Sequence, residues 1–301
     1  MNIALIATGG TIGGRKNAEG VIKLTPAATA QIQAIIDAQT VIDDVTIHSE
    51  RESFDDMYKL YGAVERAMKT CPDGIIITHG TDGLAFSSSY LAYAYSNTRI
   101  PIVMCPADLP LNEPASNGFD ILQAAKTFIK QGKRGVYVVY KNPGLAPTVH
   151  HGARILPAQL HENMFYSIGG SCDFVDSGLM HGLDFDIAGQ KVLCILPYVG
   201  LDYSAFNVNG YSAVLHSSYR SGAVNSVKFN EFAAAHPDIP MFLTVGRKRY
   251  DGQVFGKNIV QCRGITYSAL YIKILIGLKN KVKELAAFIG KNACGEIVDK
   301  I

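Results

Sequence analysis

Residues 2–11 read Asn-Ile-Ala-Leu-Ile-Ala-Thr-Gly-Gly-Thr, an apolar run that stops at a threonine and two glycines. This pattern is typical of a short strand buried on both faces of a parallel sheet. Gly9 and Gly10 let the backbone turn sharply and bring amide groups close to a ligand. Thr11 then offers a hydroxyl that can attack a carbonyl carbon. Taken alone, the loop is equally compatible with an ordinary turn whose threonine caps the next element.

A second loop of the same kind follows another apolar run, residues 74–78, and reads His79-Gly80-Thr81-Asp82-Gly83. Thr81 or Asp82 is also in the position of a cap for the helix expected from Leu84, a role compatible with catalysis. In an open parallel sheet, ligands bind beyond the carboxyl ends of the strands, where the strand order reverses. We therefore expect the two loops to share one site.

Apolar strands and amphipathic helices alternate around these loops, which is typical of βαβ units. We expect strands at residues 2–7, 41–48, 74–78, 100–105 and 135–140, with helices at 29–38, 57–70, 84–95 and 120–130. The pattern breaks down from 141 to about 177. A smaller parallel set then follows, with strands at 191–197, 213–217 and 240–245 and helices at 227–235, 266–278 and 281–289.

These patterns predict an α/β protein with two domains, as expected for a chain longer than one hydrophobic core supports. The larger N-terminal domain, residues 1–180, has a doubly wound, mostly parallel sheet and carries both threonine loops. The smaller α/β C-terminal domain comprises residues 181–301.

Composition restricts the kind of partner. With 28 basic and 26 acidic residues, the net charge is only +2, which argues against nucleic acid and favours a small molecule. Neither a signal peptide nor an apolar run of the ~18 residues that a membrane span needs is recognisable, so we expect no membrane association and a cytoplasmic location. The cysteines have no metal-type spacing, and we expect reduced thiols at Cys71, Cys105, Cys172, Cys194, Cys262 and Cys294.

Taken together, Thr-Gly-Gly-Thr-Ile at residues 8–12 and Thr-His-Gly-Thr-Asp at residues 78–82 resemble the two signature segments of the L-asparaginase family. The segments 115–124 and 134–140 resemble neighbouring parts of that family, and 217–225 does so more loosely. The resemblance implies a threonine that attacks a side-chain carboxamide, release of ammonia, and hydrolysis of the acyl-enzyme by water. It implies neither a metal nor an organic cofactor.

By position the implied nucleophile is Thr11. Thr81 and Asp82 match the residues that position water and hold the α-amino group of an amino-acid-like substrate, and backbone amides of the loops at Gly10 and Gly80 would bind it too. Ser53 is the best match for a serine that binds the substrate carboxylate, although it also suits a turn before a helix. Members of the family assemble as dimers and tetramers, so we expect a homodimer or homotetramer.

Two departures from the family pattern affect the chemistry. Family enzymes carry a lysine in a Gly-x-Arg-x-x-Lys segment, and the matching residues 152–157 place Pro157 there, which has no ionisable group. A buried lysine can activate water near neutral pH. Lys141 is a weak candidate to replace it, as are the histidines at 79, 150, 151 and 161. The lid, residues 12–25, contains no tyrosine; Arg15, Lys16 or Lys23 would instead engage a more acidic substrate.

Three functions are compatible with these residues. The first is an asparaginase-like amidohydrolase that acts on asparagine or a related amino-acid derivative. The second is a diverged acyl transferase that uses the same pocket. The third is a non-catalytic amino-acid-binding homologue, since the family lysine is replaced by Pro157.

Overall fold

The computed structural model describes residues 1–170, 174–246 and 253–298, and its first sheet carries the two threonine loops. This sheet has six strands in the order β4-β1-β5-β6-β7-β8. All neighbours are parallel except β8, which is antiparallel to β7. Their bounds are β1 Ile3–Ala7, β4 Thr40–Ile42, β5 Gly74–Thr78, β6 Pro101–Cys105, β7 Gly135–Tyr140 and β8 Thr148–His151. The predicted doubly wound, mostly parallel sheet is confirmed.

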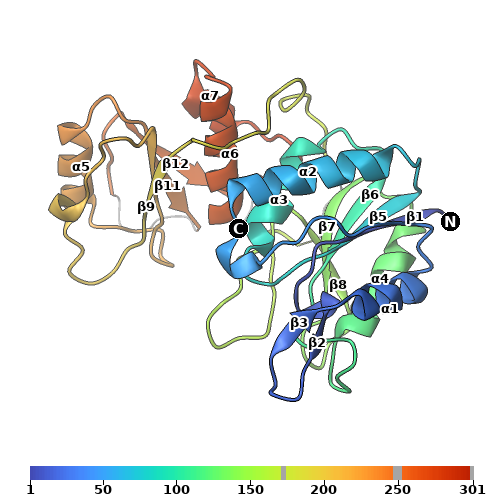
Figure 1. Ribbon diagram of the computed structural model, residues 1–301. Coiled ribbons are helices and arrows are strands. Elements are labelled where there is room, and N and C mark those ends of the chain that lie inside the picture. The colour runs from blue at the N-terminus through green and yellow to red at the C-terminus, as the bar shows by residue number, and fades with distance from the viewer. Residues whose placement is uncertain (171–173, 247–252, 299–301) are drawn as a thin grey trace.

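Helices cover both faces of this sheet (Figure 1). α2 and α3 lie on one face, and α1 and α4 lie on the other. Because both faces are covered, the central strands β5, β6 and β7 are buried along their whole length, which explains their uninterrupted apolar sequences. The helices run over Pro26–Ile36 (α1), Phe54–Met68 (α2), Leu84–Ala94 (α3) and Gly118–Ile129 (α4).

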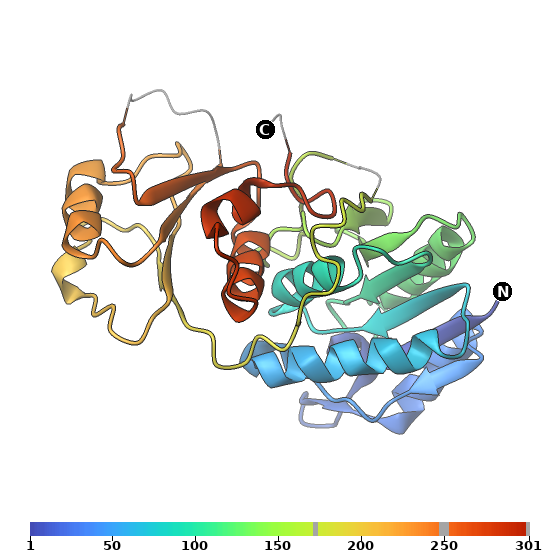
Figure 2. The ribbon, with the colours of Figure 1, turned by 90° about the horizontal axis from the view of Figure 1, so that it is seen from above.

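A second, smaller sheet is parallel throughout, with the order β12-β11-β10-β9. Its elements are β9 Val192–Ile195, β10 Ala213–His216, α5 Ser226–Ala235, β11 Met241–Val245, β12 Ile259–Arg263, α6 Tyr267–Lys279 and α7 Leu285–Gly290. One core lies between this sheet and α5. On its other side α6 packs against α3 of the first sheet (Figure 2). The boundary between residues 180 and 181 stays a prediction.

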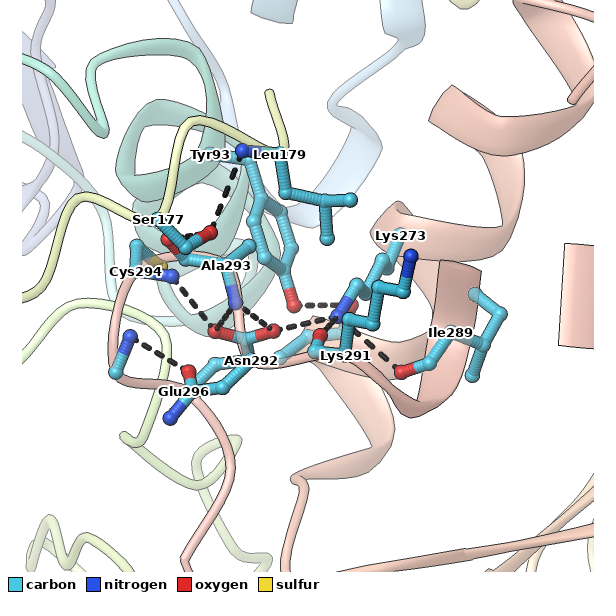
Figure 3. Close-up of polar contacts among 12 residues, drawn as sticks. Tyr93, Ser177, Leu179, Lys273, Ile289, Lys291, Asn292, Ala293, Cys294 and Glu296 are labelled. Carbon is cyan, nitrogen blue, oxygen red and sulfur yellow. Dashed lines mark hydrogen bonds and ion pairs between the residues drawn. The ribbon is translucent and has the colours of Figure 1, made fainter. Parts of the chain in front are cut away.

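The C-terminal segment is held by an ion pair from which water is excluded (Figure 3). Lys273 of α6 places Nζ 2.6 Å from Glu296 Oε1, and both side chains are fully buried. Nζ also donates to the carbonyl oxygens of Ile289, at 3.2 Å, and of Lys291. Glu296 in turn accepts hydrogen bonds from the backbone amides of residues 293 and 294. Both charges are therefore compensated, as burial requires.

Several elements differ from the sequence prediction. The segment predicted as one strand at 41–48 is interrupted at Asp43: β4 ends at Ile42, and Ile47 forms an isolated bridge with Gly9. Residues 12–25, expected only as a loop, contain the hairpin of β2 (Gly14–Lys16) and β3 (Ile22–Leu24). The strands β8 and β12 were not predicted.

In the part of the chain that the structure describes, no helix is both long and apolar enough to cross a membrane. The cysteines described there are free thiols, whereas Cys172 lies outside the described residues. No group of histidine, cysteine or carboxylate side chains among the described residues is arranged to hold a metal ion.

Candidate active site

Neighbouring strands bring the two threonine loops side by side. β1 lies between β4 and β5, so the strand order reverses there, and Ala7 at the end of β1 pairs with Thr78 at the end of β5. Thr8 Oγ1 donates to the Thr78 carbonyl oxygen at 2.5 Å, and the Gly9 amide donates to Thr78 Oγ1 at 3.3 Å. The loops therefore lie at the switch point where α/β sheets bind ligands.

Both loops open onto one cavity of about 530 Å³, called here the threonine cavity. Its lining includes Gly10, Thr11, Gly80, Thr81 and Asp82, which are five of the six site residues expected from sequence. Thr11 and Thr81 are half-buried, and Asp82 is exposed. The structure thus brings together two hydroxyls and a carboxylate in a space of small-molecule size.

Close packing explains the glycines in both loops. Gly10 has φ +72°, and a Cβ at this residue would overlap the carbonyl group of His79. A Cβ at Gly80 would overlap the side chain of Ser49. Any larger residue would separate the loops, so the glycines keep the two threonines on the same cavity.

Ser53, the sixth expected residue, lies outside the threonine cavity and caps α2. Its Oγ accepts from the Asp56 amide at 3.2 Å and donates to Asp56 Oδ2 at 2.7 Å. Ser49 lines the threonine cavity instead and was missed by sequence reasoning. A signal was available: Ser49 closely follows Ile47, the residue that pairs with the β1 loop, and so lies at the same sheet edge.

The β2–β3 hairpin covers the threonine cavity as a lid. Lys23 and Leu24 line the cavity, and Leu24 packs against Gly9. Arg15 points instead toward Gln31 of α1, with 3.5 Å between Nη2 and Oε1. Of the three lid cations expected from sequence, Lys23 is the one that lines the cavity among the residues described there.

The other candidates for the missing base lie elsewhere. Lys141 pairs with Asp120 of α4. His150 and His151 are on β8, where burial lowers the pKa of each to about 4. His151 Nε2 donates to the Cys294 carbonyl at 2.9 Å. These residues, like Pro157 and His161, are not among the described residues that line the threonine cavity.

His79 is different, because it precedes Gly80 directly and is fully buried beside a carboxylate. Its Nδ1 donates to the Gly80 carbonyl at 2.9 Å, and its Nε2 lies 3.6 Å from Glu52 Oε1. A carbonyl accepts only, so Nδ1 keeps its proton, and Nε2 faces a carboxylate oxygen that also accepts when ionised. The His79–Glu52 contact is therefore favourable when the pair holds one further proton.

Electrostatics favour that proton on the histidine. Burial opposes the charged form of His79, but the adjacent Glu52 carboxylate and the Gly80 carbonyl outweigh it and raise the pKa of His79 above its usual value. Glu52 Oε1 also accepts from Ser87 Oγ of α3. This buried pair directly behind the second threonine loop was not predicted from sequence, since Glu52 carries no spacing signal.

Residues 2–164 match the model of the N-terminal asparaginase domain. Because this match covers more than half of the chain and includes both threonine loops, the protein belongs to the asparaginase family.

Relatives in sequence carry two names. An L-asparaginase of Thermococcus kodakarensis is 46% identical over 68 residues, 23% of this chain and 21% of that protein. A glutamyl-tRNA(Gln) amidotransferase subunit of Methanopyrus kandleri is 29% identical over 171 residues, 51% of this chain and 36% of that protein. The chain thus matches only about a fifth and a third of these two relatives.

Solved structures show the same fold over the whole chain. The thermostable L-asparaginase of Thermococcus kodakarensis superimposes with a TM-score of 0.78 at 23% identity, covering 100% of both chains. L-asparaginase I of Vibrio cholerae gives 0.74 at 17% identity, covering 99% of each chain. These likenesses establish the architecture, and the activity has to be argued from the residues of the site.

Proposed function

We propose that the protein is an amidohydrolase that uses Thr11 to hydrolyse the side-chain carboxamide of asparagine or a related amino-acid derivative. The observation that carries the proposal is the convergence of Thr11, Thr81 and Asp82 on one cavity from two loops at the sheet's switch point. Membership of the asparaginase family supports it.

In the proposed reaction Thr11 Oγ1 attacks the carboxamide carbon, a bond forms to the acyl group, and ammonia leaves. Water then attacks the ester and returns the hydroxyl of Thr11, with release of the free acid. Backbone amides of the two loops stabilise the oxyanion, an interaction worth ~3 kcal/mol per donor. Thr81 positions the water.

Opposite charges in the threonine cavity suit an amino acid. We assign Asp82 to the substrate ammonium group and Lys23 to its carboxylate, because both side chains line the cavity. Ser49 takes the part expected of Ser53, since it lines the same space. A small zwitterion that bears a carboxamide therefore matches the site, in a cytoplasmic homodimer or homotetramer.

Proton handling differs from that of the family because of Pro157. Among the candidates to replace the lysine, His79 is the one that contacts a residue of the cavity, through its hydrogen bond to Gly80. We assign the His79–Glu52 pair as a positioning group that holds the second loop in its active geometry. Loss of the lysine also favours a second candidate function, a non-catalytic binding protein with the same pocket.

Ammonia release from asparagine and glutamine tests the proposal. We expect turnover by the wild type and a fall in kcat of about a thousandfold or more in Thr11→Ala, because the nucleophile is removed. Thr127→Ala, on the exposed side of α4, is the matched control and should keep full activity. Wild-type protein that binds asparagine without releasing ammonia would favour the binding protein, and ammonia without an equal amount of free acid would favour an acyl transferase.

A further inference from the structure

A second cavity of about 590 Å³ adjoins the threonine cavity and is called here the side chamber. The two share Ser49, Glu50 and Asp82, so they are continuous with one another. Free asparagine would occupy the threonine cavity alone. The proposed function therefore leaves the side chamber without an assigned occupant.

The side chamber combines an apolar wall with acidic groups. Its wall is formed by Phe54, Met57, Phe86 and Tyr271. The ring of Tyr271 lies edge-on to that of Phe86, with centroids 5.8 Å apart, and 6.4 Å from that of Phe54. Three carboxylates, Glu50, Glu52 and Asp82, line the same space, and none of the lining residues that the structure describes is basic. Aromatic faces and carboxylates together favour an organic cation with an apolar body.

Glu52 gives an independent indication of a ligand. Its side chain is only 4% exposed, and Oε2 has no hydrogen-bond partner among the described residues. Oε2 lies against Gly83, which lines the side chamber, whereas Oε1 faces Ser87 and His79 on the opposite side. A buried carboxylate oxygen without a donor is costly, and a donor on a ligand would compensate it. Protonated His79 offsets one negative charge, which leaves Glu50 and Asp82 to attract a cation.

Shared residues show which end of the substrate faces the side chamber. Thr11 and Lys23 line only the threonine cavity, whereas Asp82 lines both. With the carboxamide at Thr11 and the carboxylate at Lys23, the amino nitrogen at Asp82 points toward the side chamber. A larger substrate would therefore be extended from its amino nitrogen.

We propose that the side chamber binds an apolar group that carries a positive charge and is attached to the amino nitrogen of the amide-bearing residue. A short peptide with an apolar first residue, a free amino terminus and a final asparagine or glutamine has this chemistry. The proposal deepens the proposed function and rests on its assignment of Thr11, Lys23 and Asp82 to the two ends of the substrate. Ammonia would still leave from the side-chain amide.

Calorimetry with the Thr11→Ala variant tests this without turnover. We expect phenylalanyl-asparagine to bind about tenfold more tightly than asparagine, because the phenyl ring is buried in the side chamber. N-acetyl-phenylalanyl-asparagine, which lacks the positive charge, should lose about fivefold of that gain. Tyr271→Leu and, separately, Phe86→Leu should each weaken dipeptide binding about fivefold. Tyr219→Leu, at an exposed tyrosine outside both cavities, should leave it unchanged.

Two results would overturn the proposal. Dipeptide binding no tighter than that of asparagine would show that the side chamber is not used, and undiminished binding of the acetylated dipeptide would exclude recognition of the cation. The proposed function fails separately, if the wild type releases no ammonia from asparagine, glutamine or the dipeptide. The expected binding order in Thr11→Ala would support the side chamber even then.

Discussion

Gly10 is the residue that allows the two threonine loops to meet. Its φ is +72°, and a Cβ would overlap the His79 carbonyl group. Gly132 has a similar φ of +65° but no atom within 4 Å of the corresponding position, so it isolates the cost of the backbone conformation. We expect Gly132→Ala to destabilise the protein by about 1 kcal/mol and Gly10→Ala by about 3 kcal/mol, with loss of activity. Urea unfolding of both variants measures the difference, and equal losses would contradict the close approach of the loops.

The His79–Glu52 pair should make stability depend on pH. Because Glu52 and the Gly80 carbonyl raise the folded-state pKa of His79, the stabilisation is complete below the unfolded pKa of about 6.5 and is lost as pH rises through the folded pKa. Replacing Glu52 by glutamine removes the carboxylate partner. We expect Glu52→Gln to reduce the free energy of unfolding more at pH 6 than at pH 9.

Urea unfolding at the two pH values provides this measurement, and Glu231→Gln on exposed α5 is the control. A loss that is larger at pH 9 would show that His79 is not the group that holds the proton.

Sequence reasoning located the site residues that lie in motifs and missed those that tertiary structure brings in. Thr11, Thr81 and Asp82 each follow an apolar strand, so the sheet-edge rule was enough to place them together. Ser49 follows a broken strand, and Ser53 was preferred because it precedes a helix, which it indeed caps. Glu52 has no local pattern, because its environment comes from α3 and the second loop.

At the scale of elements, the predictable strands and helices are those with strong apolar patterns. β5 and β7 agree residue for residue with the prediction, because both are fully buried and bounded by turn residues. β8 and β12 were missed because each mixes polar and apolar residues over a few positions. The final helix begins at Leu285 instead of Lys281, which adopts a positive φ of 49°.

The Lys273–Glu296 pair anchors the C-terminal segment to α6, and its loss should be costly. Lys273→Met leaves Glu296 charged and buried, so we expect a loss of about 3–5 kcal/mol in the free energy of unfolding. Adding Glu296→Gln should restore part of this loss, since the uncompensated charge is then removed. Chemical denaturation measures all three proteins.

Lys228→Met is the matched control, because its partner Glu231 and Lys228 itself are both exposed. We expect this variant to keep the wild-type melting temperature. If Lys273→Met were equally harmless, the pair would not anchor the segment.

For the whole molecule, the two sheets and their order were predictable as a class, but their assembly was not. Periodicity predicted α6 as a helix, yet nothing in its sequence indicated that it packs against α3 and joins the first core. Such contacts depend on long-range packing, which local patterns do not encode.

We expect the protein to be a homodimer or homotetramer. Large apolar side chains are exposed in the C-terminal part, among them Leu196, Val199 and Val227, which are 62%, 96% and 66% exposed. Exposed apolar surface of this kind, where it is contiguous, is normally covered by a partner. Light scattering over a range of concentrations should give two or four times the mass of the chain, whereas a monomer throughout would refute the expectation.

The central claim is that Thr11 is the nucleophile of an amide-hydrolysing site, and intact-mass spectrometry after acid quenching tests it most directly. With asparagine or glutamine as substrate, we expect a covalent acyl adduct that peptide mapping places on Thr11 and that is absent from Thr11→Ala. The matched control Thr127→Ala should form the same adduct. Ammonia release that continues in Thr11→Ala, or an adduct on another residue, would contradict the account.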